Sequence, residues 1–130
     1  MTSQLACDLP DIVAASPISG VRFPMPCLND RVSIIAFHGT ADQNNPYNGN
    51  GPPYWTYSVL DAMSGWAAED RCTPTPVISR PGNSVELRSY AGCAGTATVQ
   101  LFTLEGEGHN LPIAIDAYET MWNTFRAHTY

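Results

Sequence analysis

The stretch VSIIAFHGTAD, residues 32–42, decides what kind of fold the chain can form. Its first six residues are β-branched and almost wholly apolar. A strand with one solvent-exposed face alternates apolar and polar residues, whereas a strand buried on both faces is a nearly continuous apolar run. Residues 32–37 therefore predict a strand inside a parallel sheet, and HGTAD starts a long polar loop at its carboxyl end.

Helical and extended patterns alternate on both sides of this strand. Residues 2–9 are typical of a helix that ends at Pro10, and residues 11–20 of a short buried strand. Residues 84–90 and 96–106 predict two further strands, the first of them half-buried and part of a hairpin. Two amphipathic helices are predicted, over 54–69 with Trp55, Val59, Met63 and Trp66, and over 113–128 with Ile115, Tyr118, Met121, Trp122 and Phe125.

The order of these elements predicts an α/β fold. Alternating strands and helices favour an open, mostly parallel sheet flanked by helices, in a single domain over residues 1–130. Ligands of such sheets bind beyond the carboxyl ends of the strands. The segments HGTAD and GEGHNLP both fall there. We expect Trp55, Trp66 and Trp122 to fill the core.

Charge and hydropathy exclude two classes of partner. The net charge is −6, and the six basic residues are scattered arginines, so no basic patch is available for nucleic acid or for an anionic membrane. No apolar run approaches the roughly 20 residues that span a bilayer. The first twenty residues lack a basic segment and contain two aspartates, so they do not resemble a signal peptide.

Four widely spaced cysteines predict two disulfides. Zinc sites usually take close pairs of cysteines, and none is present here, so we expect neither a metal nor a cofactor. Of the three possible pairings we predict Cys7–Cys27 and Cys72–Cys93, each of which closes a loop of about twenty residues. In the chain-entropy model each such disulfide stabilises the folded protein by roughly 3 kcal/mol. The Cys72–Cys93 disulfide would join the end of the helix over 54–69 to the end of the strand over 84–90, and so hold the hairpin against the sheet. Disulfides indicate an exported protein.

Asp42 and His109 are the candidate catalytic residues. Each follows a predicted strand by a few residues, so adjacent strands would bring the carboxylate and the imidazole to the same edge of the sheet. A carboxylate that accepts from an imidazole N–H fixes its tautomer and stabilises the imidazolium formed in proton transfer. The chain order Asp then His suits the base half of an α/β-hydrolase triad.

Five segments resemble, in order, the carboxyl-terminal half of secreted α/β-hydrolase esterases, of the polyhydroxyalkanoate-depolymerase-like and feruloyl-esterase-like family. They are AFHGTAD (36–42), NPYNG (45–49), SGWAAEDRC (64–72), SYAGC (89–93) and LEGEGHNLP (104–112). The resemblance implies that Asp42 is the triad acid and His109 the triad base. It also implies a secreted protein whose substrate is an ester: a polyester, a feruloylated or acetylated polysaccharide, or a small ester.

Two departures from this family stand out. Members have tryptophan, proline and glycine after the histidine's neighbour, where this chain has Leu111, Pro112 and Ile113. The chain also has no Gly-x-Ser-x-Gly; the nearest segment, AMSGW around Ser64, lies on a predicted helix. Because residues 1–20 resemble the helix and strand that follow this elbow, we expect the nucleophile about five residues upstream of Met1, in a missing half that would be a partner.

Other readings of these residues stay open. Asp42 could be a turn residue, since aspartate bonds its own backbone in turns, and His109 an ordinary loop residue. His38 is interpreted as structural, although His38, Asp42 and His109 together could hold a metal. Tyr47, Tyr54 and Trp55 could line a sugar or aryl pocket, with a core role favoured for Trp55. The chain as a whole is either an esterase fragment, inactive alone, or a non-catalytic remnant or carbohydrate- or polyester-binding module of the same fold.

Overall fold

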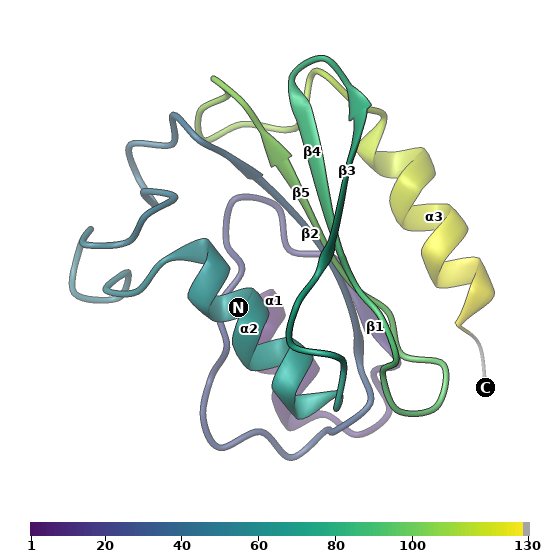
Figure 1. Cartoon of the computed structure of the whole chain (residues 1–130). Helices are drawn as coiled ribbons and strands as arrows, with labels where there is room; N and C mark the ends of the chain where they lie inside the picture. The colour runs from purple at the N-terminus through teal and green to yellow at the C-terminus, as the bar shows by residue number, and fades with distance from the viewer. Residues whose placement is uncertain (129–130) are drawn as a thin grey trace.

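All seven residues of strand β2 (Ser33–Gly39) are buried, as the continuous apolar run predicts. The computed structural model describes residues 1–128, and within them β2 belongs to a five-stranded sheet with helices on both faces (Figure 1). The other strands are β1 (Ala14–Ala15), β3 (Val77–Gly82), β4 (Val85–Tyr90) and β5 (Val99–Leu104). The helices are α1 (Thr2–Asp8), α2 (Val59–Glu69) and α3 (Ala117–Ala127). The predicted α/β class and the order of elements are confirmed.

The sheet is mixed, so the expectation of a mostly parallel sheet is wrong. Its strand order is β1-β2-β5-β4-β3, in which β1 and β5 flank β2 in parallel while β4 and β3 continue the sheet antiparallel. A parallel connection needs a dozen or more residues. The turn at 83–84 and the loop 91–98 are both shorter, so β3, β4 and β5 can pair only antiparallel. The predicted hairpin is therefore part of the sheet.

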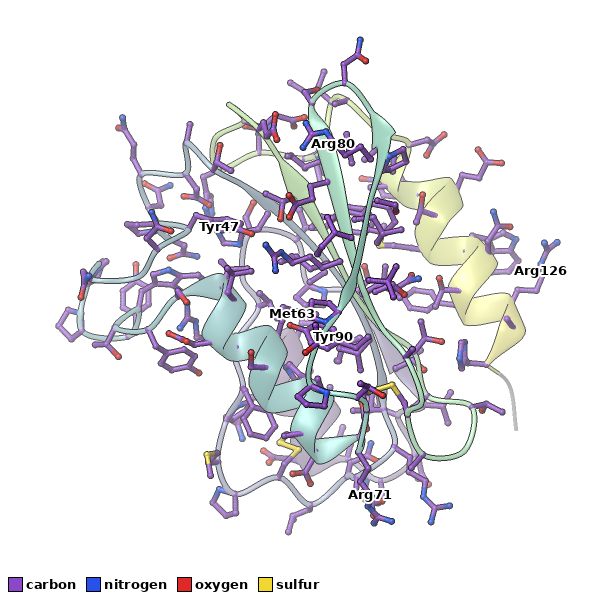
Figure 2. All side chains as sticks on the ribbon, viewed as in Figure 1. Tyr47, Met63, Arg71, Arg80, Tyr90 and Arg126 are labelled. Carbon is purple, nitrogen blue, oxygen red and sulfur yellow. A yellow bond between two sulfur atoms is a disulfide. The ribbon has the colours of Figure 1, made fainter. Side chains whose placement is uncertain are left out.

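Alternate side chains of β2 serve two separate hydrophobic clusters. Ile34 and Ala36 pack in one cluster with residues from α1 and α2, including Met63, which lies with Tyr90 between α2 and the sheet (Figure 2). Ile35 and Phe37 belong to the second cluster, under α3. Figure 1 accordingly shows α1 and α2 on one side of the sheet and α3 on the other. A strand covered on both faces cannot alternate in polarity.

Helix α2 begins at Val59, five residues after the predicted start. Ser58 caps it: its hydroxyl accepts from the Asp61 N–H, and the Asp61 carboxylate accepts from the Ser58 N–H. This reciprocal arrangement is a capping box, which fixes a helix start. Trp55 therefore precedes the helix, although it is buried as expected, and so is Trp66 within it.

The orientation of helix α3 differs from the prediction. Tyr118 and Trp122 are 65% and 63% exposed, so the expectation that Trp122 fills the core is wrong. The helix instead faces the sheet through Ala117 and Met121, both in the second cluster. Ala117 and Met121 are four residues apart and share a face. Ile115 and Met121 of the predicted face thus pack against the sheet, whereas Tyr118 and Trp122 do not.

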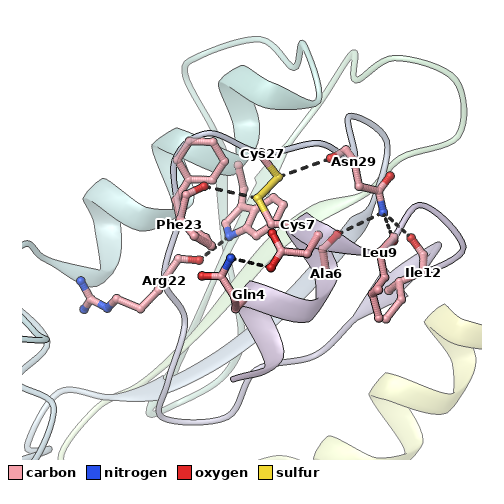
Figure 3. The surroundings of a disulfide bond; sticks show 12 residues. Gln4, Ala6, Cys7, Leu9, Ile12, Arg22, Phe23, Cys27 and Asn29 are labelled. Atoms are coloured by element: carbon pink, nitrogen blue, oxygen red, sulfur yellow. Dashed lines mark hydrogen bonds between the residues drawn. A yellow bond between two sulfur atoms is a disulfide. The ribbon is translucent and has the colours of Figure 1, made fainter.

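Both predicted disulfides, Cys7–Cys27 and Cys72–Cys93, are present. The first ties α1 to the loop before β2, where the Asn29 side-chain amide also donates to carbonyl oxygens of α1 and the residues after it (Figure 3). These bonds hold a segment whose strand, β1, has only two residues of the predicted 11–20. In the described part of the chain, no helix is long and apolar enough to cross a membrane.

Candidate active site

Strands β2 and β5 end side by side, and the two candidate residues follow them. The strands are parallel and in register through Gly39 opposite Leu104. The loop carrying Asp42 leaves the end of β2, and the loop carrying His109 leaves the end of β5. Both loops therefore start at the same edge of the sheet, the one where ligands of open α/β sheets bind.

Asp42 and His109 are in direct hydrogen-bond contact. The His109 Nδ1 lies 2.9 Å from the Asp42 Oδ2, so the predicted approach at the carboxyl edge of adjacent strands is confirmed. The Asp42 side chain is fully buried, whereas the His109 side chain is 41% exposed. A carboxylate oxygen can only accept, so Nδ1 carries a proton in this contact and Nε2 is the basic nitrogen of the neutral ring.

The second oxygen of Asp42 accepts from its own loop. The backbone N–H groups of Asn44 and Asn45 donate to Oδ1 at 2.9 and 2.8 Å. This is the turn geometry that the alternative reading of Asp42 expected. The turn geometry and the contact with His109 coexist, because Oδ1 closes the turn and Oδ2 is left for the imidazole. Three strong donors compensate the buried carboxylate for the water it has lost.

Backbone contacts between the two loops fix the distance between Asp42 and His109. Thr40 N–H donates to the Leu104 carbonyl at 3.0 Å, and Ala41 N–H donates to the Glu107 carbonyl at 2.9 Å. In the other direction, Gly106 N–H donates to the Thr40 hydroxyl at 2.8 Å. Ala41, directly before Asp42, is thus hydrogen-bonded to Glu107, two residues before His109. The contact between β2 and β5 therefore continues beyond the strands into the two loops.

The Glu107 carboxylate organises the loop that carries His109. It accepts from the backbone N–H groups of Ile113 at 2.9 Å and Ala114 at 3.0 Å, and from the Asn110 side chain at 3.4 Å. A charged acceptor on two backbone donors holds a loop more strongly than neutral hydrogen bonds do. Glu107 was not identified from the sequence, since a single glutamate in a polar loop gives no signal of its own.

His38 also belongs to this site, although the sequence indicated only a structural role. It is completely buried, and its Nε2 lies 2.9 Å from the Asn45 carbonyl oxygen and 3.4 Å from the Asp42 Oδ2. Burial lowers the pKa of His38, so the ring is neutral near pH 7. The sequence signal for this contact is the four-residue spacing between His38 and Asp42, which a tight turn after β2 brings together.

The three aromatic residues considered for a sugar or aryl pocket, all in the loop after β2, do not share a surface. The Tyr47 hydroxyl lies 2.7 Å from the Thr103 hydroxyl, and the Trp55 ring is 2% exposed, as its core reading expected. Only Tyr54 is largely exposed. A pocket lies elsewhere, directly after His109, and is lined by residues 111–113 and 115–118.

Within residues 1–128, no group of three or more histidine, cysteine, aspartate or glutamate side chains is arranged to hold a metal ion. His38 and His109 both direct their Asp42-facing nitrogens at hydrogen-bond acceptors, which requires N–H groups there rather than metal-binding lone pairs. No contact between Ser64 and His109 is present: Ser64 is exposed on α2, and among the described residues His109 has a hydrogen bond only to Asp42.

Searches against models of protein families and against curated protein sequences found no match to this chain.

Proposed function

We propose that the chain is the acid- and base-bearing part of a serine carboxylic ester hydrolase. The observation that carries the proposal is the 2.9 Å contact between His109 Nδ1 and the buried Asp42 Oδ2. The proposal extends the fold to the carboxyl-terminal half of an α/β-hydrolase, of the polyhydroxyalkanoate-depolymerase-like and feruloyl-esterase-like kind. The parallel pairing of β1, β2 and β5, with the two residues at their carboxyl edge, supports this extension.

Each residue has a definite role in this reaction. The His109 Nε2 takes the proton of an attacking serine hydroxyl and returns it to the leaving alkoxide. Asp42 keeps the proton on Nδ1, orients the ring and stabilises the imidazolium that forms. The partly exposed ring edge of His109 beside a buried Asp42 supports these roles, because the basic nitrogen must reach substrate while the carboxylate is shielded.

The nucleophile and the oxyanion hole lie outside these 130 residues in this proposal. No serine of the chain stands in a Gly-x-Ser-x-Gly segment. Strand β1 is a two-residue edge strand, parallel to β2, and its outer edge is where a further parallel strand carrying the elbow would pair. The partner is thus an upstream half of the same enzyme, and the assembled protein is secreted, with which the two disulfides are consistent.

The second candidate is a non-catalytic remnant, or a carbohydrate- or polyester-binding module, of the same fold. The absence of a nucleophile elbow from the chain favours it. The coding sequence directly before Met1 separates the two candidates. An in-frame Gly-x-Ser-x-Gly supports the esterase, whereas sequence without such an elbow supports the remnant or binding module.

Hydrolysis of p-nitrophenyl acetate tests the esterase directly. We expect no turnover by residues 1–130 alone, because a His–Asp pair without a serine has no hydroxyl to activate. Joining the chain to an upstream half with Gly-x-Ser-x-Gly should produce turnover. In the joined protein His109→Ala should lower kcat by several orders of magnitude, and Asp42→Asn by roughly 10⁴-fold.

His128→Ala is the matched control for the histidine substitution. His128 follows α3 and contacts Thr96 and Thr124 rather than Asp42, so its removal should leave kcat unchanged. Robust hydrolysis by residues 1–130 alone that survives His109→Ala would show that both the nucleophile and the base have been assigned wrongly.

A further inference from the structure

His38 is a second imidazole on the carboxylate that binds His109. It is the last residue but one of β2 and has no exposed surface. Its Nε2 faces two acceptors, the Asn45 carbonyl oxygen at 2.9 Å and the Asp42 Oδ2 at 3.4 Å. Its Nδ1 is also buried and has no hydrogen-bond partner among the described residues.

These surroundings determine which nitrogen of His38 carries the proton. A proton on Nε2 gives the Asn45 carbonyl oxygen a donor, points positive charge toward the Asp42 Oδ2 and leaves an unpaired lone pair on Nδ1. A proton on Nδ1 would instead bury an unpaired donor and set the Nε2 lone pair against two oxygen atoms. The neutral ring therefore has its proton on Nε2, where it is donated to the Asn45 carbonyl oxygen and lies near the Asp42 Oδ2.

The contact with Asn45 closes the turn around Asp42 from its far end. Asn45 N–H donates to the Asp42 Oδ1 at 2.8 Å, while the carbonyl of Asn45 accepts from His38. The Asn45 side-chain amide also donates to the Ser19 carbonyl at 2.7 Å. Asn45 is thus hydrogen-bonded to Asp42, to His38 on β2 and to Ser19 in the segment after β1.

Two aromatic rings hold the plane of the His38 imidazole. The Trp55 ring is stacked on it with centroids 5.5 Å apart, and the Tyr47 ring meets it edge-on at 6.0 Å. The Trp55 indole is itself tied down by a hydrogen bond to the Pro46 carbonyl at 2.7 Å. A ring held in this way cannot turn its Nε2 away from the Asp42 carboxylate without losing its packing.

We propose that His38 is a positioning residue for the His109–Asp42 pair, which holds the Asp42 carboxylate so that Oδ2 faces His109 Nδ1. The expected effect of His38 on turnover rests on the proposed esterase function, whereas its effect on the position of Asp42 involves only residues of this chain. The positioning role and the esterase function can therefore be tested separately.

The first test needs no substitution. Nitrogen-15 NMR of the chain 1–130 distinguishes the two neutral tautomers of a histidine ring, and we expect His38 with its proton on Nε2. A proton on Nδ1 would overturn the proposal, because His38 could not then donate to the Asn45 carbonyl that closes the turn around Asp42. This measurement is independent of whether any ester is hydrolysed.

Two substitutions then separate the hydrogen bond from the packing of the ring. His38→Gln keeps an amide N–H that can take the place of Nε2 but removes the ring. His38→Phe keeps a ring for Trp55 but removes the donor. The readout is the downfield proton resonance of the His109 Nδ1–H in its bond to Asp42, with near-ultraviolet circular dichroism confirming the fold of each variant.

We expect His38→Gln to retain this resonance and His38→Phe to lose it or broaden it by faster exchange with water. In the joined enzyme, His38→Phe should lower kcat roughly 10-fold with little change in KM, as expected for the loss of one hydrogen bond that holds the Asp42 loop, and His38→Gln should restore most of it. A resonance retained in folded His38→Phe, or lost in folded His38→Gln, would overturn the proposal. Absence of esterase activity with the expected resonances would instead reject only the proposed function.

Discussion

Gly39 lies directly against the backbone of Glu107. A Cβ added at Gly39 would stand 2.1 Å from the Glu107 carbonyl oxygen and 2.9 Å from that of Gly108. These atoms belong to the loop that carries His109, and Gly39 ends the strand from which Asp42 follows. The absence of a side chain at this position is therefore what allows the two loops to approach closely enough for the Asp42–His109 contact.

We predict that Gly39→Ala separates the two loops. The new methyl group meets backbone rather than a flexible side chain, so the loop of His109 must move. We expect the free energy of unfolding to fall by about 1–3 kcal/mol, as in other overpacked sites. The downfield Nδ1–H resonance of His109 should also disappear.

Gly20→Ala is the matched control for Gly39→Ala. A Cβ at Gly20 would meet its nearest atom, the Ile18 carbonyl oxygen, at an ordinary 3.6 Å. Urea unfolding should therefore show no large loss of stability in this variant. If Gly39→Ala is as stable as Gly20→Ala and keeps the His109 resonance, the close approach does not constrain the site.

Glu107 should act on the His109 loop through its carboxylate. We predict that Glu107→Ala frees the Ile113 and Ala114 N–H groups, so that their exchange with solvent measured by NMR becomes faster. The free energy of unfolding should fall by about 1–3 kcal/mol, since hydrogen bonds to charged groups are lost.

Glu105→Ala gives the comparison for Glu107→Ala within the same loop. Glu105 forms an ion pair with Arg80 at 2.9 Å in which both side chains are 47% exposed. Such surface pairs contribute about 0–1 kcal/mol. Equal effects of the two substitutions on Ile113 and Ala114 exchange would contradict the assigned role of Glu107.

Asp70, after the last residue of α2, should make stability depend on pH. Its side chain is buried, and neither carboxylate oxygen has a partner among the described residues. Burial, aided by the nearby charges of Glu69 and Asp30, raises the pKa of Asp70 from 3.8 to about 7. Between these two values the unfolded chain has lost the proton that the folded chain keeps, so stability falls as the pH rises.

We predict that Asp70→Asn removes this dependence. Asparagine carries no charge, so the variant should gain on the original chain by up to about 1.4 kcal/mol for each pH unit between about 4 and 7, and no further above that range. Urea unfolding at pH 4, 5.5, 7 and 8.5 measures the difference. A constant difference across this series would show that Asp70 does not titrate on unfolding.

The sequence was sufficient for the parts of the fold that depend on local pattern. The apolar run of β2 predicted its burial on both faces, and the places of Asp42 and His109 after two strands predicted their contact. The antiparallel pairing of β4 with β5 follows from the short connection between them, which cannot form a parallel crossover, and not from the apolar pattern of either strand. The contacts of His38 with Asn45 and Trp55 could not be predicted from the sequence, because only the folding of a long loop brings these residues to it.

Helix α3 illustrates the limit of helical periodicity. Apolar residues at 115, 118, 121, 122 and 125 cover a broad arc, and the sequence does not show which part of it meets the sheet. Ala117 lies at the contact because a small side chain lets the helix approach β2 and β5. The larger Tyr118 and Trp122 then point away from the sheet.

The exposure of Trp122 gives a last prediction that tests the packing of α3. Trp55 and Trp66 are almost fully buried, whereas Trp122 is 63% exposed. Iodide, which does not enter a packed interior, should therefore quench only part of the tryptophan fluorescence of the chain. Trp122→Phe should remove the quenched part and leave the free energy of unfolding within about 0.5 kcal/mol, as for other surface substitutions. Trp66→Phe is the control and should leave the quenched part in place. If Trp122→Phe is strongly destabilising and iodide quenching is unchanged, α3 faces the sheet through Trp122 after all.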